Sequence, residues 1–294
     1  MTILFCESSI DNRNEPDEAF LEEYESAVKN GFFVLLFNFD NITTENIKAI
    51  NKIEKVIYRG WMLKPFQYAK LYNELFAKNY ILVNNPVEYQ NCHYLPDSLQ
   101  FINNCTPKTI YQKIENEESI ELLLKKAEVF EGKPVIIKDY VKSEKHYWKT
   151  ACFIENSNDT EKLRESIKNF ITLRENAFNE GIVLREFVEL EYLAIHSKSS
   201  MPLSVEFRLF FFNNELIDIF DYWEEDDYKI EKPDINFFIE LAKSVKSNFF
   251  TMDIAKKKDG EYIVMELGDG QVAGIPLCCN KNEFYSNLMD RMTL

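Results

Sequence analysis

The hydrophobic positions of the first hundred residues form short apolar runs separated by helical stretches. Runs at 3–6, 32–37, 55–58 and 81–83 have the length of buried strands. An acidic helical stretch covers 15–29, and a helix starting at Pro65 carries Leu71 and Leu75 on one face. Alternating strands and helices predict a mostly parallel sheet covered by helices, in a domain of about residues 1–105.

The middle third continues the mixture of helices and strands. A helix with apolar positions from Ile120 to Ala127 precedes predicted strands at 134–138 and near 150–154, an amphipathic helix over 163–171 and a strand over 181–191.

The last third has the pattern of antiparallel strands. Faces alternate over 205–212, a turn is expected at Asn213-Asn214, and a second strand covers 215–222. A helix over 235–242 and a hairpin over 249–267 complete the pattern.

The hairpin brings two carboxylates together. If Asp259-Gly260 forms a two-residue turn, Lys258 pairs with Glu261 and, counting outward, Asp253 lies opposite Glu266. Facing carboxylates repel, and a bound cation would reverse that penalty. Magnesium in nucleotide sites uses one or two carboxylates completed by phosphate oxygens. The alternative is an exposed acidic pair neutralised by neighbouring lysines.

The loop after Glu266 reads LGDGQVAG and contains three of the chain's eight glycines. Tight backbone is therefore used at this point of the chain. Asp269 in this loop has two possible roles. It either adds an oxygen to the metal site or makes the side-chain turn bond common for aspartate in such loops.

The composition describes a packed protein with an acidic surface. The formal net charge is −15, which disfavours nucleic-acid binding, and 46% of residues are hydrophobic. There is no apolar run of membrane-spanning length and no signal-peptide pattern, so we expect a cytoplasmic protein with no membrane partner. The six cysteines have no zinc-site spacing and are expected to be reduced thiols.

Positive charge is concentrated where it would suit an anionic ligand. The segment 138–149, KDYVKSEKHYWK, gathers four lysines and a histidine, although a solvated basic turn is the alternative. Arg208 shares a strand face with Glu206, and Arg185 ends an apolar strand. Cations for phosphates and carboxylates for magnesium are what phosphoryl transfer requires.

Over roughly residues 106–279 these motifs resemble the ATP-grasp superfamily. PVIIK resembles the strand whose lysine, here Lys138, contacts the α and β phosphates of ATP. VLREFVELE resembles the segment joining the two lobes. The resemblance assigns adenine and ribose contacts to this segment, at Glu186, Phe187, Val188 and Glu191, with Glu189 as an alternative to Glu191.

EFRLFF resembles the strand whose arginine, here Arg208, reaches the phosphates, and the final hairpin resembles the metal-binding one, with Asp253 and Glu266 as ligands. The chain is similar to the clade named for two arginines and one lysine, which correspond to Arg185, Arg208 and Lys138. Two departures stand out: residues 139–149 lack glycine, and Gly268 stands where the superfamily usually has the asparagine of a Glu-x-Asn metal motif.

The resemblance implies an α/β N-terminal domain followed by a two-lobed α+β ATP-grasp module, with a small lobe at 106–191 and a C-terminal lobe at 192–294. It implies a ligase that uses ATP and Mg²⁺ to join a small-molecule or peptide carboxylate to an amine through an acyl phosphate. Arg208, Arg185 and Lys142 would neutralise charge during transfer, and residues 139–149 would form a lid.

Two other functions remain open. One is a kinase that stops after phosphoryl transfer to a small molecule, and the other is an ATP-binding protein without turnover. Arg59, Trp61 and His93 are candidates for an acceptor pocket, but a buried tryptophan and a histidine with its hydrogen bonds made in the core are the favoured roles. The sequence does not indicate the substrates or the oligomeric state.

Overall fold

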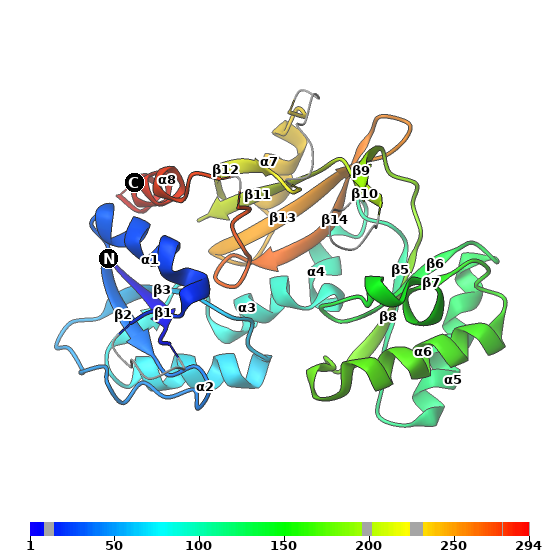
Figure 1. Ribbon diagram of the computed structural model, residues 1–294, viewed down its shortest axis with the longest axis horizontal. Coiled ribbons are helices and arrows are strands. Elements are labelled where there is room, and N and C mark those ends of the chain that lie inside the picture. Colours follow the sequence, from blue (N-terminus) through cyan, green and yellow to red (C-terminus); the bar gives the residue numbers. More distant parts are fainter. Residues whose placement is uncertain (9–14, 196–201, 224–231, 278, 294) are drawn as a thin grey trace. The chain divides into compact units, whose positions relative to one another are not determined.

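The computed structural model describes residues 1–8, 15–195, 202–223, 232–277 and 279–293 (Figure 1). The described part divides into two compact units. Unit 1 comprises residues 1–93, 206–253 and 267–294, and unit 2 comprises residues 94–205 and 254–266. Unit 1 therefore consists of three segments and unit 2 of two, and the last hairpin contributes to both units.

The first sheet of unit 1 is parallel, as the sequence predicts. Its order is β2-β1-β3-β4, and its strands are β1 (Thr2–Cys6), β2 (Phe33–Phe37), β3 (Glu54–Arg59) and β4 (Tyr80–Leu82). Helix α1 (Leu21–Lys29) covers one face and α2 (Pro65–Phe76) the other (Figure 1). Alternation along β1 explains this, since Ile3 and Phe5 face the α1 side while Leu4 and Cys6 face α2.

One boundary in this region differs from the prediction. The helix predicted over 15–29 begins later, with a 3₁₀ turn at Glu18–Phe20 before α1. Pro16 instead forms a bridge with Glu7, and Asp17 caps the turn by accepting from the amide of Ala19. The sequence analysis also missed two helices, α3 (Pro86–His93) and α4 (Leu95–Ile102).

The remainder of unit 1 shares a core with this sheet. Strands β11 (Glu206–Phe212), β12 (Glu215–Asp221), β13 (Phe249–Lys256) and β14 (Tyr262–Asp269) form a sheet of order β12-β11-β13-β14, of which residues 254–266 belong to unit 2. Helices α7 (Asn236–Ala242) and α8 (Lys281–Thr293) accompany the sheet in unit 1. Asn213 and Asn214 both have positive φ, which confirms the predicted turn between β11 and β12. Phe5, Phe210 and Phe284 belong to one buried cluster, so distant segments fold as one body.

Unit 2 is built on an antiparallel sheet of order β5-β8-β6-β7. Its strands are β5 (Thr109–Lys113), β6 (Val135–Asp139), β7 (Phe153–Ile154) and β8 (Gly181–Glu186), and β9 (Tyr192–Ile195) pairs separately with β10 (Pro202–Ser204). Helices α5 (Glu117–Ala127) and α6 (Thr160–Arg174) cover one face, through the apolar positions predicted for them (Figure 1).

Two predicted strands of unit 2 were too long. Residues 148–152 form a π-helical turn, Trp148–Cys152, so only two residues of the strand predicted near 150–154 are extended. The strand predicted over 181–191 ends at Glu186. Beyond it, Phe187 donates its amide to the carbonyl of Pro134, and Leu190 forms only an isolated bridge with Lys257.

The predicted hairpin turn was wrong by one residue. The amide of Lys257 donates to the carbonyl of Glu261, and Gly260, with φ of +92°, donates back to Lys257. The loop is therefore three residues long, with glycine at the left-handed position. At the open end of the hairpin, the amide of Gly270 donates to the carbonyl of Phe249. These two residues lie opposite each other if the loop is counted as two residues long. The two ends differ by one residue, so the pairing of Asp253 with Glu266 stays a prediction.

Candidate active site

Strands β6 and β8 of unit 2 bring two cationic side chains onto one face. Lys138 lies opposite Val183, and Ile136 lies opposite Arg185. Opposed residues on antiparallel strands share a face, so Lys138 and Arg185 are diagonal neighbours. The other face carries Val135, Ile137, Ile182 and Leu184, which pack under α5 and α6. Apolar alternation therefore fixes the direction of both cations.

Lys138 is paired with one of the predicted metal ligands. Its Nζ lies 2.8 Å from Oε2 of Glu266, and the exposed fractions of the two side chains are 11% and 38%. Both residues belong to unit 2. Partial burial makes this pair stronger than a surface ion pair, yet Glu266 keeps enough exposure to meet a ligand.

Arg185 is a buried cation without a carboxylate partner among the described residues. Its exposed fraction is 5%; Nη2 donates to the hydroxyl of Thr106 and the carbonyl of Val264, while Nε has no acceptor. Burial lowers the pKa of Arg185 to about 10, against the opposing effect of Glu266. A buried guanidinium with an unmet donor would be stabilised by an anion.

The segment predicted to meet adenine and ribose follows β8. Phe187 is 38% exposed and packs edge-on against Phe153 and Trp148, with ring centroids 5.1 and 6.2 Å away. The rings of Trp148 and Phe153 are stacked, with an interplanar angle of 6°. The sequence analysis missed these two aromatic partners, although aromatic residues at 148 and 153 beside the basic segment were visible in the sequence.

The polar residues of this segment have separate partners. Glu186 pairs with Lys133 at 2.9 Å, and Glu189 pairs with Lys258 at 2.9 Å. Val188 and Glu191 are partly buried, and the amide of Glu191 donates to the carbonyl of Lys256. Glu189 is 68% exposed in its side chain, so its ion pair is a weak one.

The basic segment is anchored at its start by Asp139, which is fully buried. Its carboxylate accepts from the amides of Val141 and Lys142 and from Arg174 and Asn179. Lys142, Lys145, His146 and Lys149 are all exposed. The sequence showed the lysines, but the buried anchor depends on long-range contacts.

In unit 1, Arg208 forms a two-pronged pair with Asp253. Nε and Nη2 donate to the two carboxylate oxygens at 2.8 and 2.7 Å, and Nη1 donates to the carbonyl of Gly274. The guanidinium carbon lies 4.7 Å from the ring centroid of Tyr222, an aromatic contact that the sequence analysis did not predict. Asp253 is 3% exposed.

Asp269 makes the turn bond that was one of its two possible roles. Its Oδ1 accepts from the amide of Gln271 at 2.9 Å, and Oδ2 accepts from Nδ2 of Asn84 at 2.6 Å. The side chain is fully buried in unit 1, and burial raises its pKa to about 7.

No three His, Cys, Asp or Glu side chains in the described ranges form a ready-made metal cluster. Magnesium does not require one, because one or two carboxylates and phosphate oxygens suffice. Asp253 and Glu266 fit that requirement as oxygen donors, because each is paired with a cation, Arg208 or Lys138, that phosphates could take in exchange. Asp269 is instead held in the core by the uncharged donors Asn84 and Gln271.

The three residues considered for an acceptor pocket differ in burial and in their partners. Arg59 is 1% exposed and pairs with Glu23 at 2.9 Å, which is a structural role. His93 is buried and its ring lies 4.8 Å from that of Tyr89. The expectation of a buried Trp61 was wrong: it is 45% exposed, because its indole nitrogen donates to Asp17 at the edge of a pocket.

The fold is that of ATP-grasp proteins, and three solved structures match nearly the whole chain. One is D-alanyl-alanine synthetase A from Vibrio cholerae, at 11% identity and a TM-score of 0.59, covering 100% of this chain and 99% of that one. A second is the macrocyclase MdnC from Microcystis aeruginosa, bound to its precursor peptide MdnA. It has 14% identity and a TM-score of 0.56, and the match covers 99% of this chain and 100% of that one. The third is the ATP-grasp ligase PsnB with minimal precursor, Mg and ADP. It has 13% identity and a TM-score of 0.57, and the match covers 99% of this chain and 98% of that one.

The chain belongs to an ATP-grasp domain family, the third family of the clade named for two arginines and one lysine, whose model matches residues 130–288. The matched range contains Lys138, Arg185, Arg208, Asp253 and Glu266. No curated protein matches the chain significantly. Among the described helices, none is long and apolar enough to cross a membrane.

Proposed function

We propose that the protein is an ATP- and Mg²⁺-dependent ligase that joins a carboxylate to an amine. The observation that carries the proposal is the face of β6 and β8, where Lys138 and Arg185 are neighbours and Glu266 is the carboxylate paired with Lys138. Two cations with one carboxylate leave a positive site, which suits phosphate groups.

Two of the three cations predicted to contact phosphates, Lys138 and Arg208, are each paired with a predicted metal ligand. The third, Arg185, is buried. Lys138 pairs with Glu266 in unit 2, and Arg208 pairs with Asp253 in unit 1. In each pair, a phosphate would take the cation and a metal ion would take the carboxylate, so neither charge would be left unpaired. These residues therefore suit the metal complex better than ATP alone.

Magnesium would screen the charge that develops on the phosphates. The residues of the chain would supply the other contributions to catalysis. Lys138 and Arg208 orient the phosphates, Arg185 provides a fixed positive charge that needs no reorganisation, and Phe187 with Phe153 and Trp148 provides an aromatic surface for adenine. The basic segment 139–149, with Lys142, is proposed as a lid that excludes water from the acyl phosphate.

Two of the similar structures support a class of substrate. One is a macrocyclase bound with a precursor peptide, and the other is a D-alanyl-alanine synthetase. They favour a peptide or amino acid as the carboxylate substrate and an amine as its acceptor. We propose a cytoplasmic enzyme without a nucleic-acid partner, consistent with the net charge of −15.

The test supplies the purified protein with ATP, Mg²⁺ and a cell extract depleted of other ATPases, and follows ADP and product masses. We expect ADP release together with a product whose mass equals two metabolites minus water. Hydroxylamine should intercept the acyl phosphate as a hydroxamate. Arg185→Met should abolish ADP release, the product and the hydroxamate, whereas Arg164→Met, on the surface of α6, should leave all three unchanged.

The two alternative functions predict different results. A kinase would release ADP and a stable phosphorylated product without an amine and without hydroxamate. A non-catalytic protein would bind ATP and release no ADP from any mixture. Either result would replace the ligase assignment.

A further inference from the structure

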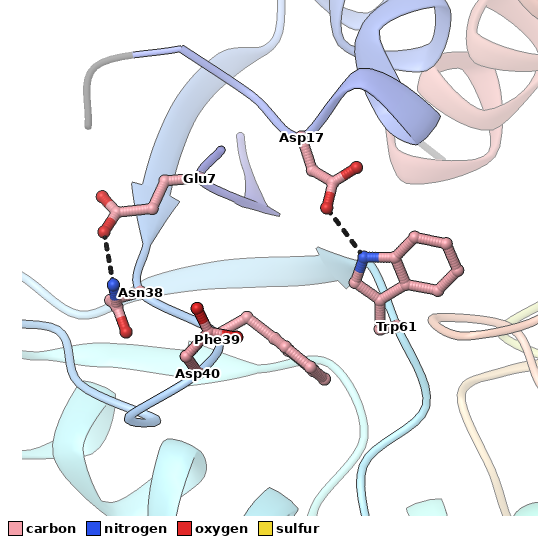
Figure 2. A pocket seen from close by; sticks show the side chains of 6 residues that line it. All are labelled: Glu7, Asp17, Asn38, Phe39, Asp40 and Trp61. Carbon is pink, nitrogen blue, oxygen red and sulfur yellow. Dashed lines mark hydrogen bonds between the residues drawn. The ribbon is translucent and has the colours of Figure 1, made fainter. Parts of the chain in front are cut away.

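A cavity of unit 1 lies at the carboxyl ends of the parallel strands (Figure 2). Its volume is about 270 Å³, and its lining residues are Glu7, Asp17, Asn38, Phe39, Asp40 and Trp61. Glu7 directly follows β1, Asn38 directly follows β2, and Trp61 lies two residues beyond β3. Ligands of open α/β sheets bind at this edge, because the strands end there and the loops diverge.

Backbone bonds hold the rim of the cavity in place. The amide of Asp17 donates to the carbonyl of Cys6 at 2.9 Å, so the chain returns beside the end of β1. Asn38 and Thr43 exchange two backbone bonds of 3.2 and 3.1 Å, which close a tight turn carrying Phe39 and Asp40. The lining side chains are thus positioned by the fold.

The cavity is acidic. Of the six lining residues that the structure describes, three are carboxylates and none is basic, and Glu7, Asp17 and Asp40 form no ion pair with another described residue. Glu7 is 5% exposed, and its Oε1 accepts from Nδ2 of Asn38 at 2.9 Å (Figure 2). Its Oε2 is buried and has no donor among the described residues. A buried carboxylate oxygen without a donor is costly to keep ionised, and a positive charge in the adjoining cavity would lower that cost without a direct bond to this oxygen.

Aromatic surface completes the lining. Trp61 is 45% exposed; its indole nitrogen donates to Asp17 at 2.9 Å, and Phe20 packs edge-on at 5.2 Å. These contacts fix the ring while part of it stays exposed. An indole face attracts organic cations and also covers apolar stems.

A metal ion is a poorer ligand for this cavity than an organic cation. No three carboxylates in the described part of the chain converge as metal ligands. Aromatic surface does not coordinate magnesium or calcium, which require oxygen atoms. Spaced carboxylates beside aromatic rings suit an ammonium group, whose three N–H donors point in different directions.

We propose that this cavity binds a primary ammonium group on a short apolar stem, as in a small alkylamine or a lysine side chain. The volume, slightly below the ~300 Å³ lower bound of drug-sized pockets, suits such a ligand. The proposal goes beyond the ligase function and does not depend on ATP or on turnover.

The experiment is a ligand-observed NMR titration of the full chain, without nucleotide, using n-butylammonium, 1-butanol and acetyl-Gly-Lys-Gly-amide. We expect n-butylammonium to bind and 1-butanol, similar in shape but uncharged, to bind at least about tenfold more weakly. Binding of the peptide as well would identify a lysine side chain as the source of the ammonium, whereas binding of the alkylamine alone would identify a free small amine.

Charge-removing variants locate the site. Glu7→Gln should weaken n-butylammonium about tenfold or more, and the exposed Asp40→Asn about two- to fivefold, with a loss that shrinks at high salt. Glu45→Gln, an exposed carboxylate of the same unit outside the cavity, should bind as the wild type does. Asp40→Asn keeps the test decisive if Glu7→Gln does not fold.

Equal binding of n-butylammonium and 1-butanol would overturn the proposal. So would unchanged affinity in Asp40→Asn, or displacement of the amine by equimolar Mg²⁺. None of these results bears on ATP turnover, so failure here leaves the ligase proposal standing.

Discussion

The guanidinium of Arg208 holds both carboxylate oxygens of Asp253, at 2.8 Å from Nε and 2.7 Å from Nη2. Both side chains are mostly buried, with exposed fractions of 14% and 5%. A parallel two-point pair of this kind is among the stronger ionic contacts in proteins. ATP without a metal would take Arg208 and leave the carboxylate unpaired, which explains why the metal complex should be the preferred ligand.

We therefore expect ATP to raise the melting temperature only when Mg²⁺ is present. At a ligand concentration of one hundred times Kd the gain is about 2.7 kcal/mol, or several degrees. Asp253→Asn and Glu266→Gln should each remove most of the magnesium-dependent shift, measured by differential scanning fluorimetry. Glu240→Gln, an exposed carboxylate, is the control. Equal shifts with and without metal would remove Asp253 and Glu266 from the site.

Lys138→Met should weaken ATP about 10- to 100-fold and adenosine less than about twofold, because the ammonium contacts phosphates and not the nucleoside. Isothermal titration of both ligands measures the difference. Lys133→Met is a matched control, since its lysine is exposed and paired with Glu186. If ATP and adenosine lose affinity alike, Lys138 has only a structural role.

Arg185→Met should lower the affinity for ATP without a comparable loss of folding stability. The buried guanidinium has an unmet donor, so its removal should leave the free energy of unfolding within about 1 kcal/mol of wild type or increase it. ATP affinity should fall in the same variant. Urea unfolding with and without Mg²⁺-ATP gives both quantities. A large loss of stability with unchanged ATP affinity would show that Arg185 supports the fold alone.

The basic segment 139–149 should become protected from proteolysis when Mg²⁺-ATP binds. Lys142→Ala with Lys145→Ala should lower turnover more than ATP affinity, because charge neutralisation counts most during transfer. The double variant Lys162→Ala with Lys168→Ala, on α6, controls for loss of surface charge. Equal cleavage in both states together with intact turnover would make the segment a fixed surface turn.

Asp269 should make stability depend on pH. Burial raises its folded pKa to about 7 from the usual value of 3.8, so the folded state holds this proton more tightly than the unfolded state. The stability it contributes is fully present below pH ~4 and is lost as pH rises to ~7. Asp269→Asn should flatten this slope in urea titrations from pH 4 to 7. An unchanged slope would show that the hydrogen bonds from Asn84 and Gln271 keep the carboxylate ionised.

Local patterns were enough to predict the elements with a clear period and the residues they carry. Alternation over 134–138 put Lys138 on the face of Ile136, and the register of β6 with β8 confirms it. The apolar stripe from Ile120 to Ala127 is buried in α5 as predicted. These features follow from local geometry, since a side chain's direction in a strand or helix repeats with the backbone. The motifs around them were also enough to indicate the family.

Contacts across long stretches of sequence could not be predicted in this way. The anchoring of Asp139 by Arg174, the contact of Arg185 with the carbonyl of Val264 and the sharing of one core by Phe5, Phe210 and Phe284 have no local signature. The hairpin turn shows the same limit, because both a two-residue and a three-residue loop suit Asp-Gly, and packing along the strands selects between them. Contacts between distant segments depend on how whole elements pack, and no pattern within one element records that packing.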